Sequence, residues 1–305
     1  MYLPASSELR ARAADALSCA PNHRRLVLIH VGITTLVSLL VSGINFALES
    51  GIANTGGLQG VGLRSILTTA QMLLTLAMSI LLPFWDLGYT RCALGLARKE
   101  PTPGSALLSG FRKFLPALWM LILTYLVYTL LAVACIYTGS ILLSFTPLAE
   151  PVYQLMLTAD PTAIDPNLLL ETMAPMLIIC GVAYVGLLIP ATYRLRLSAY
   201  FLMDGSTGFR ALLSSFRAMK GNCVNLFFLD LRFWWFYGLQ RILTAIAYGD
   251  LLLPYLGIQM NDTLAYFLFY CLSLAGQLAL FLWAKNTVAT TYAHAYLSLL
   301  PNNEE

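Results

Sequence analysis

Six long apolar runs constrain the fold of this chain more than any other feature. A helix needs about 20 predominantly apolar residues to cross the hydrocarbon core of a bilayer. Every run reaches that length, so we expect an all-α, polytopic transmembrane bundle of six helices that forms a single integral membrane domain over residues 1–305. The runs cover residues 26–48, 65–85, 115–145, 173–203, 223–249 and 263–284.

Composition supports a membrane protein and excludes several other classes. Of the 305 residues, 58% are hydrophobic and only 11% are charged, whereas soluble domains carry about 25% charged residues. The six cysteines are widely scattered, without a CxxC pair or a Cys/His cluster, so neither a disulfide framework nor a zinc site is expected. A net charge of +3 is too small to indicate a nucleic-acid partner.

The Lys and Arg residues predict the orientation of the bundle. The connections 49–63, 146–172 and 250–262 contain neither residue. The segments that alternate with them are basic, because each carries three or four Lys or Arg residues. Basic loops stay in the cytoplasm, so both termini are predicted to be cytoplasmic in a multi-pass protein whose main partner is the lipid bilayer. The basic residues are Arg10, Arg12, Arg24, Arg25, Arg98, Lys99, Arg112, Lys113, Arg210, Arg217 and Lys220.

A short internal repeat indicates tandem units. Residues 106–112 (ALLSGFR) and 211–217 (ALLSSFR) agree at six of seven positions. Both copies precede an apolar run that leads outward, so the units share one orientation and form a parallel repeat rather than an inverted one. We therefore expect three hairpin-like repeats, although chance similarity among membrane sequences is the alternative. The expected units are 7–103, 104–205 and 206–299.

A short cytoplasmic amphipathic helix is expected before each pair of spans, at residues 7–17, 104–113 and 207–219. A basic amphipathic helix beside a span commonly lies in the headgroup layer. The alternative is a docking element for a cytoplasmic protein partner, which would apply to 104–113 and 207–219. Both interpretations predict a helix with one apolar and one basic face.

The second copy of the repeat carries a family resemblance. Residues 215–221 (SFRAMKG) followed by 226–231 (LFFLDL) resemble the bacterial family named domain of unknown function 975. The resemblance implies a six-span integral protein of the bacterial plasma membrane, without an established activity or cofactor. Two departures leave open whether a family role is altered here. Arg232 replaces a small Ser, and Asn286–Thr287 replaces a Pro-Tyr pair.

Charged residues inside the apolar runs are the candidates for a functional site, because burying charge in lipid is costly. Asp230 and Arg241 lie 11 residues apart in the fifth run. On a continuous helix Asp230 and Arg241 would lie about 16 Å apart and on the same face as Tyr237. Each would then need a partner from another helix, such as Arg194 for Asp230 in a structural role, or would face a water-filled polar path through the bundle. A second group collects at the inner ends of three other runs and comprises Asp86, Arg194, Arg196 and Lys285.

No catalytic, cofactor-binding or metal-binding residues are predicted, because hydrolytic triads, HExxH, Walker A and dinucleotide fingerprints are absent from the sequence. We expect a non-enzymatic bundle that binds or transports a small solute or forms part of a larger membrane assembly. Two alternatives remain, namely a permease subunit driven by a separate ATPase and, with less support, a lipid-modifying enzyme.

Overall fold

Long helices dominate the structure, a computed structural model that describes residues 3–54, 60–145, 150, 166–249 and 262–300. Every regular element in these residues is a helix, which confirms the all-α prediction. Five stretches are long and apolar enough to cross a membrane, so the structure supports a membrane protein. The helices that contribute them are α2 (His23–Asn54), α3 (Gly60–Ala97), α5 (Phe114–Ser144), α7 (Pro166–Leu195) and α12 (Asp262–Leu297).

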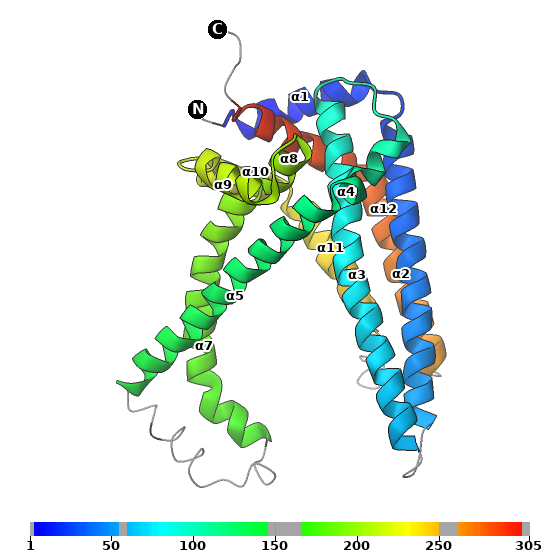
Figure 1. Cartoon of the computed structure of the whole chain (residues 1–305), viewed down its shortest axis with the longest axis vertical. Helices are drawn as coiled ribbons and strands as arrows, with labels where there is room; N and C mark the ends of the chain where they lie inside the picture. Colours follow the sequence, from blue (N-terminus) through cyan, green and yellow to red (C-terminus); the bar gives the residue numbers. More distant parts are fainter. Residues whose placement is uncertain (1–2, 55–59, 146–149, 151–165, 250–261, 301–305) are drawn as a thin grey trace.

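Short helices gather at one end of the long ones, which we call the capped end (Figure 1). Short helical elements are found at all three positions where the sequence predicts them, so their existence is confirmed. The predicted Lys/Arg-free connections 146–172 and 250–262 lie largely outside the described residues. The short elements are α1 (Ser6–Ser18), η1 (Gly104–Leu108), α4 (Ser109–Arg112), α8 (Ser198–Met203), α9 (Gly208–Ala218) and α10 (Cys223–Arg232).

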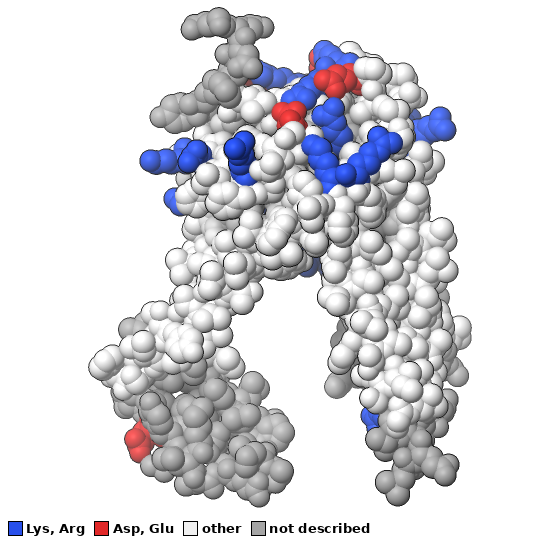
Figure 2. Space-filling view, viewed as in Figure 1, with Lys and Arg blue, Asp and Glu red and all other residues white. Residues whose placement is uncertain are grey.

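Two arms extend from the capped end (Figure 1). One arm consists of α5 and α7, which pack against each other. The other contains α2, α3, α12 and α11 (Trp234–Ile246), which also contact one another. In the space-filling view an open gap separates the arms below the cap (Figure 2). Most Lys and Arg side chains on this face gather at the capped end, and one blue patch lies near the far end of an arm (Figure 2).

The short helices pack in a recurring way. The elements η1 and α4 lie on α3, α9 lies on α7 and α8, and α1 lies on α12. Glycines allow the first of these contacts to be very close. A Cβ on Gly88 would lie 1.7 Å from the Leu107 carbonyl oxygen, and a Cβ on Gly110 would lie 1.9 Å from that of Phe84. The backbones of α3 and the η1–α4 segment therefore touch directly.

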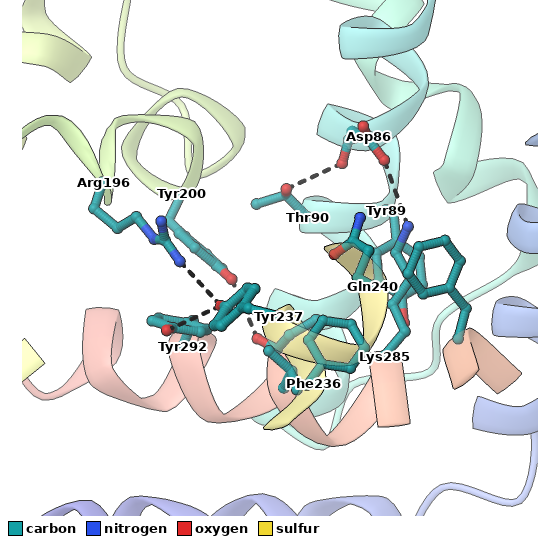
Figure 3. Close-up of a pocket in the computed structure, with 13 residues that line it drawn as sticks. Asp86, Tyr89, Thr90, Arg196, Tyr200, Phe236, Tyr237, Gln240, Lys285 and Tyr292 are labelled. Carbon is teal, nitrogen blue, oxygen red and sulfur yellow. Dashed lines mark hydrogen bonds and ion pairs between the residues drawn. The ribbon is translucent and has the colours of Figure 1, made fainter. Parts of the chain in front are cut away.

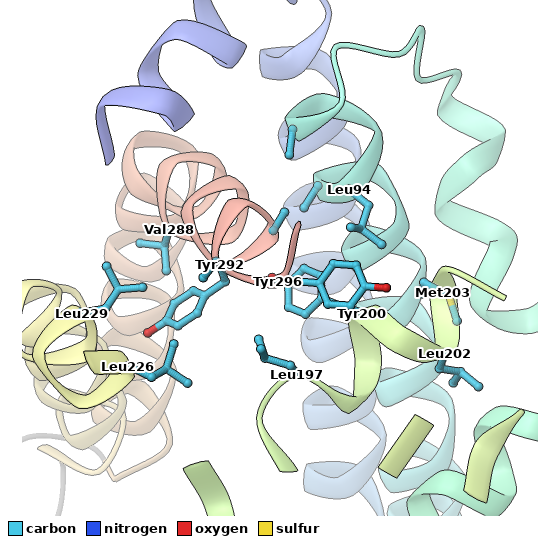
Figure 4. Close-up of a cluster of buried hydrophobic side chains, with 14 of the residues drawn as sticks. Leu94, Leu197, Tyr200, Leu202, Met203, Leu226, Leu229, Val288, Tyr292 and Tyr296 are labelled. Atoms are coloured by element: carbon cyan, nitrogen blue, oxygen red, sulfur yellow. The ribbon is translucent and has the colours of Figure 1, made fainter. Parts of the chain in front are cut away.

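The hydrophobic core lies at the capped end rather than along the arms. Leu94, Leu197, Tyr200 and Tyr296 are buried where α3, α8 and α12 converge (Figure 4). By contrast, apolar side chains along the arms are widely exposed, as at Leu73 (61%) and Val182 (70%). Exposed apolar surface on this scale marks contact with a membrane or another protein. The arms therefore have the surface expected of helices in lipid.

A polar node ties the same three helices together beside this core. Asp204 follows α8, and its Oδ2 accepts hydrogen bonds from Arg98 Nη2 and from the Tyr296 hydroxyl, both at 2.7 Å. Arg98 follows α3, and Tyr296 belongs to α12. One carboxylate thus links the capped ends of α3, α8 and α12.

The fifth apolar run does not form the single helix that the sequence predicts. It is divided into α10 and α11, which meet at Phe233. At this break the Phe233 and Phe236 N–H groups donate to carbonyls three residues earlier, at 2.9 Å, instead of continuing the α-helical pattern. Phe233 is only 2% exposed, so burial of its ring in the core accompanies the break. The prediction of one continuous span over 223–249 is therefore wrong.

Candidate functional site

A cavity of about 260 Å³ lies where the two arms meet, and we call it the junction cavity. Its lining comes from α3, the α7–α8 bend, α11 and α12. The charged members are Asp86, Arg196 and Lys285. Figure 3 shows these side chains on opposite sides of a group of aromatic rings. The aromatic lining consists of Tyr89, Tyr200, Phe236, Tyr237, Phe281 and Tyr292.

Lys285 organises one side of the cavity. Its Nζ lies 2.8 Å from His30 Nε2 and 3.6 Å from Asp86 Oδ1. His30 Nε2 also lies 3.3 Å from Asp86 Oδ1, so this imidazole nitrogen contacts both the ammonium and the carboxylate. Asp86 keeps 66% of its side chain exposed. Its carboxylate therefore remains accessible although it is paired.

His30 is held rigidly behind Lys285. Its side chain is fully buried, and its ring stacks on Trp85 with 5.5 Å between centroids and contacts Tyr89 at 4.5 Å. Among the described residues no hydrogen-bond partner is found for His30 Nδ1. These contacts fix the imidazole, and the imidazole in turn positions the Lys285 ammonium.

Arg196 organises the opposite side, from the bend between α7 and α8. Its Nη2 donates to the Tyr237 hydroxyl at 3.0 Å and to Asp230 Oδ1 at 3.4 Å. The Tyr193 hydroxyl donates to the other Asp230 oxygen at 2.7 Å. The guanidinium carbon also lies 5.2 Å from the centre of the Tyr292 ring, within cation–π range. The Arg196 side chain is thus fixed by α10, α11 and α12 together.

The structure brings together five of the seven residues that the sequence singles out. Asp86, Arg196, Tyr237 and Lys285 line the cavity, and Asp230 lies directly behind Arg196. These five converge from helices far apart in the sequence, as expected of costly intramembrane charges.

The other two predicted residues lie elsewhere. Arg194 is exposed and stacks on Phe216, with 4.6 Å between the guanidinium carbon and the ring centre. Arg241 is exposed on α11 and does not line the junction cavity. Asp230 therefore pairs with Arg196 rather than Arg194. The break at Phe233 also removes the continuous face that Asp230 and Arg241 were predicted to share.

Sequence reasoning missed His30, Tyr200 and Tyr292 as members of this site. The signal for His30 was its position inside an apolar run, where a polar ring needs a partner. Its partners Asp86 and Lys285 lie 56 and 255 residues away, so no local spacing pointed to them. No pattern in the sequence distinguishes Tyr200 and Tyr292 from the other tyrosines of the apolar runs.

Comparison with known proteins gives one match. Residues 1–273 match the family described as Protein of unknown function (DUF975). No curated protein and no solved structure matches the chain. The matched region includes Asp86, Arg196 and Asp230, whereas Lys285 and Tyr292 lie beyond it. The match covers most of the chain, so this protein, with its apolar helices and its charged cavity between two arms, belongs to the DUF975 family.

Proposed function

We propose that this protein is a non-enzymatic, multi-pass membrane protein that binds a small polar solute with an anionic group in the junction cavity. The observation that carries this proposal is the pair of cations, Arg196 and Lys285, positioned across one aromatic-walled cavity. Such a protein acts in the membrane as a carrier or as the solute-recognising part of a larger assembly.

The size of the cavity favours a small ligand. Pockets for drug-sized molecules run from about 300 to 1,000 Å³, and the junction cavity holds about 260 Å³. Its lining combines six aromatic rings with three charged side chains. This combination supports a solute of a few heavy atoms with both a charged group and a flat or apolar part.

Arg196 is the group best suited to hold an anionic part of the solute. Its guanidinium has five N–H donors, and both of its protein hydrogen bonds start from Nη2. Among the described residues no hydrogen bond starts from Nη1 or Nε, so these atoms can face a ligand. A carboxylate or phosphate can accept a charge-assisted hydrogen bond from either of these atoms, while the accessible Asp86 carboxylate can take a donor from the same solute.

The lining lacks the groups that would favour an enzyme. Thr90 contributes the only aliphatic hydroxyl of the lining, and it donates to the Asp86 carbonyl at 3.0 Å. Catalysis by a serine- or threonine-type nucleophile needs such a hydroxyl beside a general base, and among the described residues no general base is a hydrogen-bond partner of Thr90. Within the described lining, binding is therefore better supported than covalent chemistry.

A thermal-shift screen tests this proposal. Purified protein is heated with a panel of small anionic, zwitterionic, cationic and neutral solutes. A ligand at 100 times its dissociation constant stabilises the folded state by about 2.7 kcal/mol. We expect stabilisation by at least one anionic or zwitterionic solute in the wild type and its loss in Arg196→Gln.

Two further variants make the screen specific. Arg194→Gln removes the same charge two residues away, outside the cavity, and is expected to keep the response. Gln240→Trp fills the cavity without removing an ion-pair partner, and it is expected to abolish the response in a folded protein. A response that survives both Arg196→Gln and Gln240→Trp would place the ligand elsewhere and refute the proposal.

The number of membrane crossings depends on whether the described chain begins and ends at the same end of the long helices. Both α1 and the last turns of α12 lie at the capped end (Figure 1). This placement supports an even number of crossings. We infer that α10 and α11 form part of one further crossing, in addition to the five long stretches. This crossing is broken, because α11 has only 13 residues and spans about 20 Å of the roughly 30 Å core.

We also infer three tandem units that close into a ring. The support is that each short helix packs on the returning helix of the unit before it, and α1 does the same with α12. Each outgoing helix also pairs with its own returning helix, as α2 with α3, α5 with α7 and α11 with α12. We propose that the capped end faces the bacterial cytoplasm, because it carries the Lys and Arg residues of the basic segments.

A further inference from the structure

A second cavity, of about 620 Å³, lies between the start of α2 and the second half of α12. We call it the α2–α12 groove. It is separate from the junction cavity, and the two share no lining residue. A ligand in the groove would therefore not occupy the proposed solute site.

The end of the groove nearest the cap is strongly basic. Arg24 and Arg25 line it, both are exposed, and no acidic side chain belongs to the lining. Among the described residues neither guanidinium forms an ion pair with a carboxylate. Other basic residues of the cap are paired, for example Lys99 with Asp15 and Arg98 with Asp204. Two guanidinium groups that line one groove without a carboxylate partner in the described part of the chain attract an anion.

Asn286 keeps the basic end in place. Its amide donates to the His23 carbonyl at 2.8 Å and accepts from the Tyr89 hydroxyl at 2.5 Å. These bonds fasten α12 to the first residue of α2, immediately before Arg24. The basic end of the groove is thus held by two helices and does not depend on loop conformation.

The groove becomes apolar with increasing distance from the cap. The change occurs at the same distance from the cap on α2 and on α12. On α2 the change runs from Arg24 to Leu28, and on α12 from Asn286 to Leu282. Each step is four residues, or about 6 Å along a helix. Because α2 leads away from the cap and α12 leads toward it, both changes run in the same direction. The groove therefore has one polar and one apolar end.

The apolar end opens to the surface that faces lipid. Leu28 is 55% exposed and Trp283 is 73% exposed. Eleven residues further from the cap, on the same face of each helix, Leu39 is 42% and Leu272 is 56% exposed. Tryptophan is enriched at the boundary between headgroups and hydrocarbon, so Trp283 marks the depth at which the groove changes character.

We propose that the α2–α12 groove binds an anionic phospholipid, with Arg24 and Arg25 on its phosphate-bearing headgroup and the acyl chains along the exposed faces of α2 and α12. A soluble phosphate compound would match the basic end alone. A phospholipid matches the whole groove, because the molecule changes from a charged headgroup to apolar chains over the same short distance as the groove does. Basic pockets between membrane helices commonly bind anionic headgroups.

Native mass spectrometry of delipidated protein in detergent tests the proposal. The protein is titrated separately with phosphatidylglycerol and with zwitterionic phosphatidylcholine. The double variant Arg24→Gln/Arg25→Gln is compared with Arg210→Gln/Arg217→Gln, which removes the same charge from exposed positions of α9. Thermal unfolding without lipid checks that each variant is folded.

We expect the wild type to bind phosphatidylglycerol in preference to phosphatidylcholine. Loss of two arginines near an anionic group should weaken phosphatidylglycerol binding about 30-fold, with phosphatidylcholine binding unchanged. The α9 control should stay within about twofold of the wild type.

Three results would overturn the proposal. The first is equal affinity of the wild type for the two lipids. The second is a phosphatidylglycerol preference that survives in the folded Arg24→Gln/Arg25→Gln variant. The third is displacement of bound phosphatidylglycerol by glycerol 3-phosphate, since this would assign the groove to a soluble phosphate compound.

Discussion

Replacing Asp204 by Asn tests whether the capped end is held together where α3, α8 and α12 converge. Asp204 Oδ2 accepts from Arg98 and Tyr296 at 2.7 Å. Its side chain is 20% exposed and that of Arg98 is 27% exposed, so solvent screens the ion pair only in part. Asn keeps one acceptor oxygen but removes the charge that Arg98 faces.

The expected magnitude follows from these two bonds. A hydrogen bond to a charged group contributes about 1.5–3 kcal/mol. With partial screening and one retained acceptor, we expect the Asp204→Asn variant to lose about 2 kcal/mol of unfolding free energy. For a chain of this size that corresponds to a fall of about 3–6 °C in thermal midpoint. Tyr296→Phe removes only one of the two bonds and should cost less.

Asp15→Asn is the matched control for this measurement. Asp15 pairs with Lys99 at the same 2.7 Å, but both side chains are more than half exposed. The Lys99 ammonium lowers the pKa of Asp15, and the carboxylate in turn raises the pKa of Lys99. Exposed pairs contribute little, so the midpoint should hardly change. Equal shifts for Asp15→Asn and Asp204→Asn in purified protein would refute the reasoning.

Three other predictions concern packing, orientation and the cavity. Gly88→Ala should lower the thermal midpoint sharply, because the new Cβ would overlap the Leu107 carbonyl. Gly32→Ala is the control and should be tolerated, because a Cβ there meets nothing within 4 Å. Equal midpoints for the two variants would contradict the close contact of α3 with η1. In a cysteine-free background, a membrane-impermeant thiol reagent added from outside should label a cysteine at position 160 and not one at 102, and the reverse would overturn the orientation. Lys285→Met should lower the affinity for any solute found in the thermal screen, as measured by a binding assay. The variant should still insert into the membrane, as measured by fractionation. Unchanged affinity would remove Lys285 from the site.

The parts of the fold set by local properties could be predicted from the sequence. Hydropathy over a span of 20 or more residues marks a membrane helix, and this located the five long apolar stretches. The short helices were marked by their amphipathic pattern, as at 207–219, where α9 occupies Gly208–Ala218. Both signals lie within one segment and need no knowledge of its neighbours.

The parts that depend on distant contacts could not be predicted in this way. The break at Phe233 coincides with the burial of its ring and with the attachment of Asp230 to Tyr193 and Arg196. Choosing Arg196 over Arg194 as the partner required knowing the bend between α7 and α8. The cost of charge in lipid indicated which residues mattered, and tertiary contacts decided which of them meet.

Native mass spectrometry of protein released gently from its own membrane shows whether the junction cavity holds a small solute. If the junction cavity binds a small solute, the wild type and Arg194→Gln should carry one additional mass, too small for a lipid, that dissociates on mild activation. That mass should be absent from folded Arg196→Gln and from Gln240→Trp. The same adduct on all four proteins, or on none of them even after incubation with the solutes of the thermal screen, would contradict the proposed binding site.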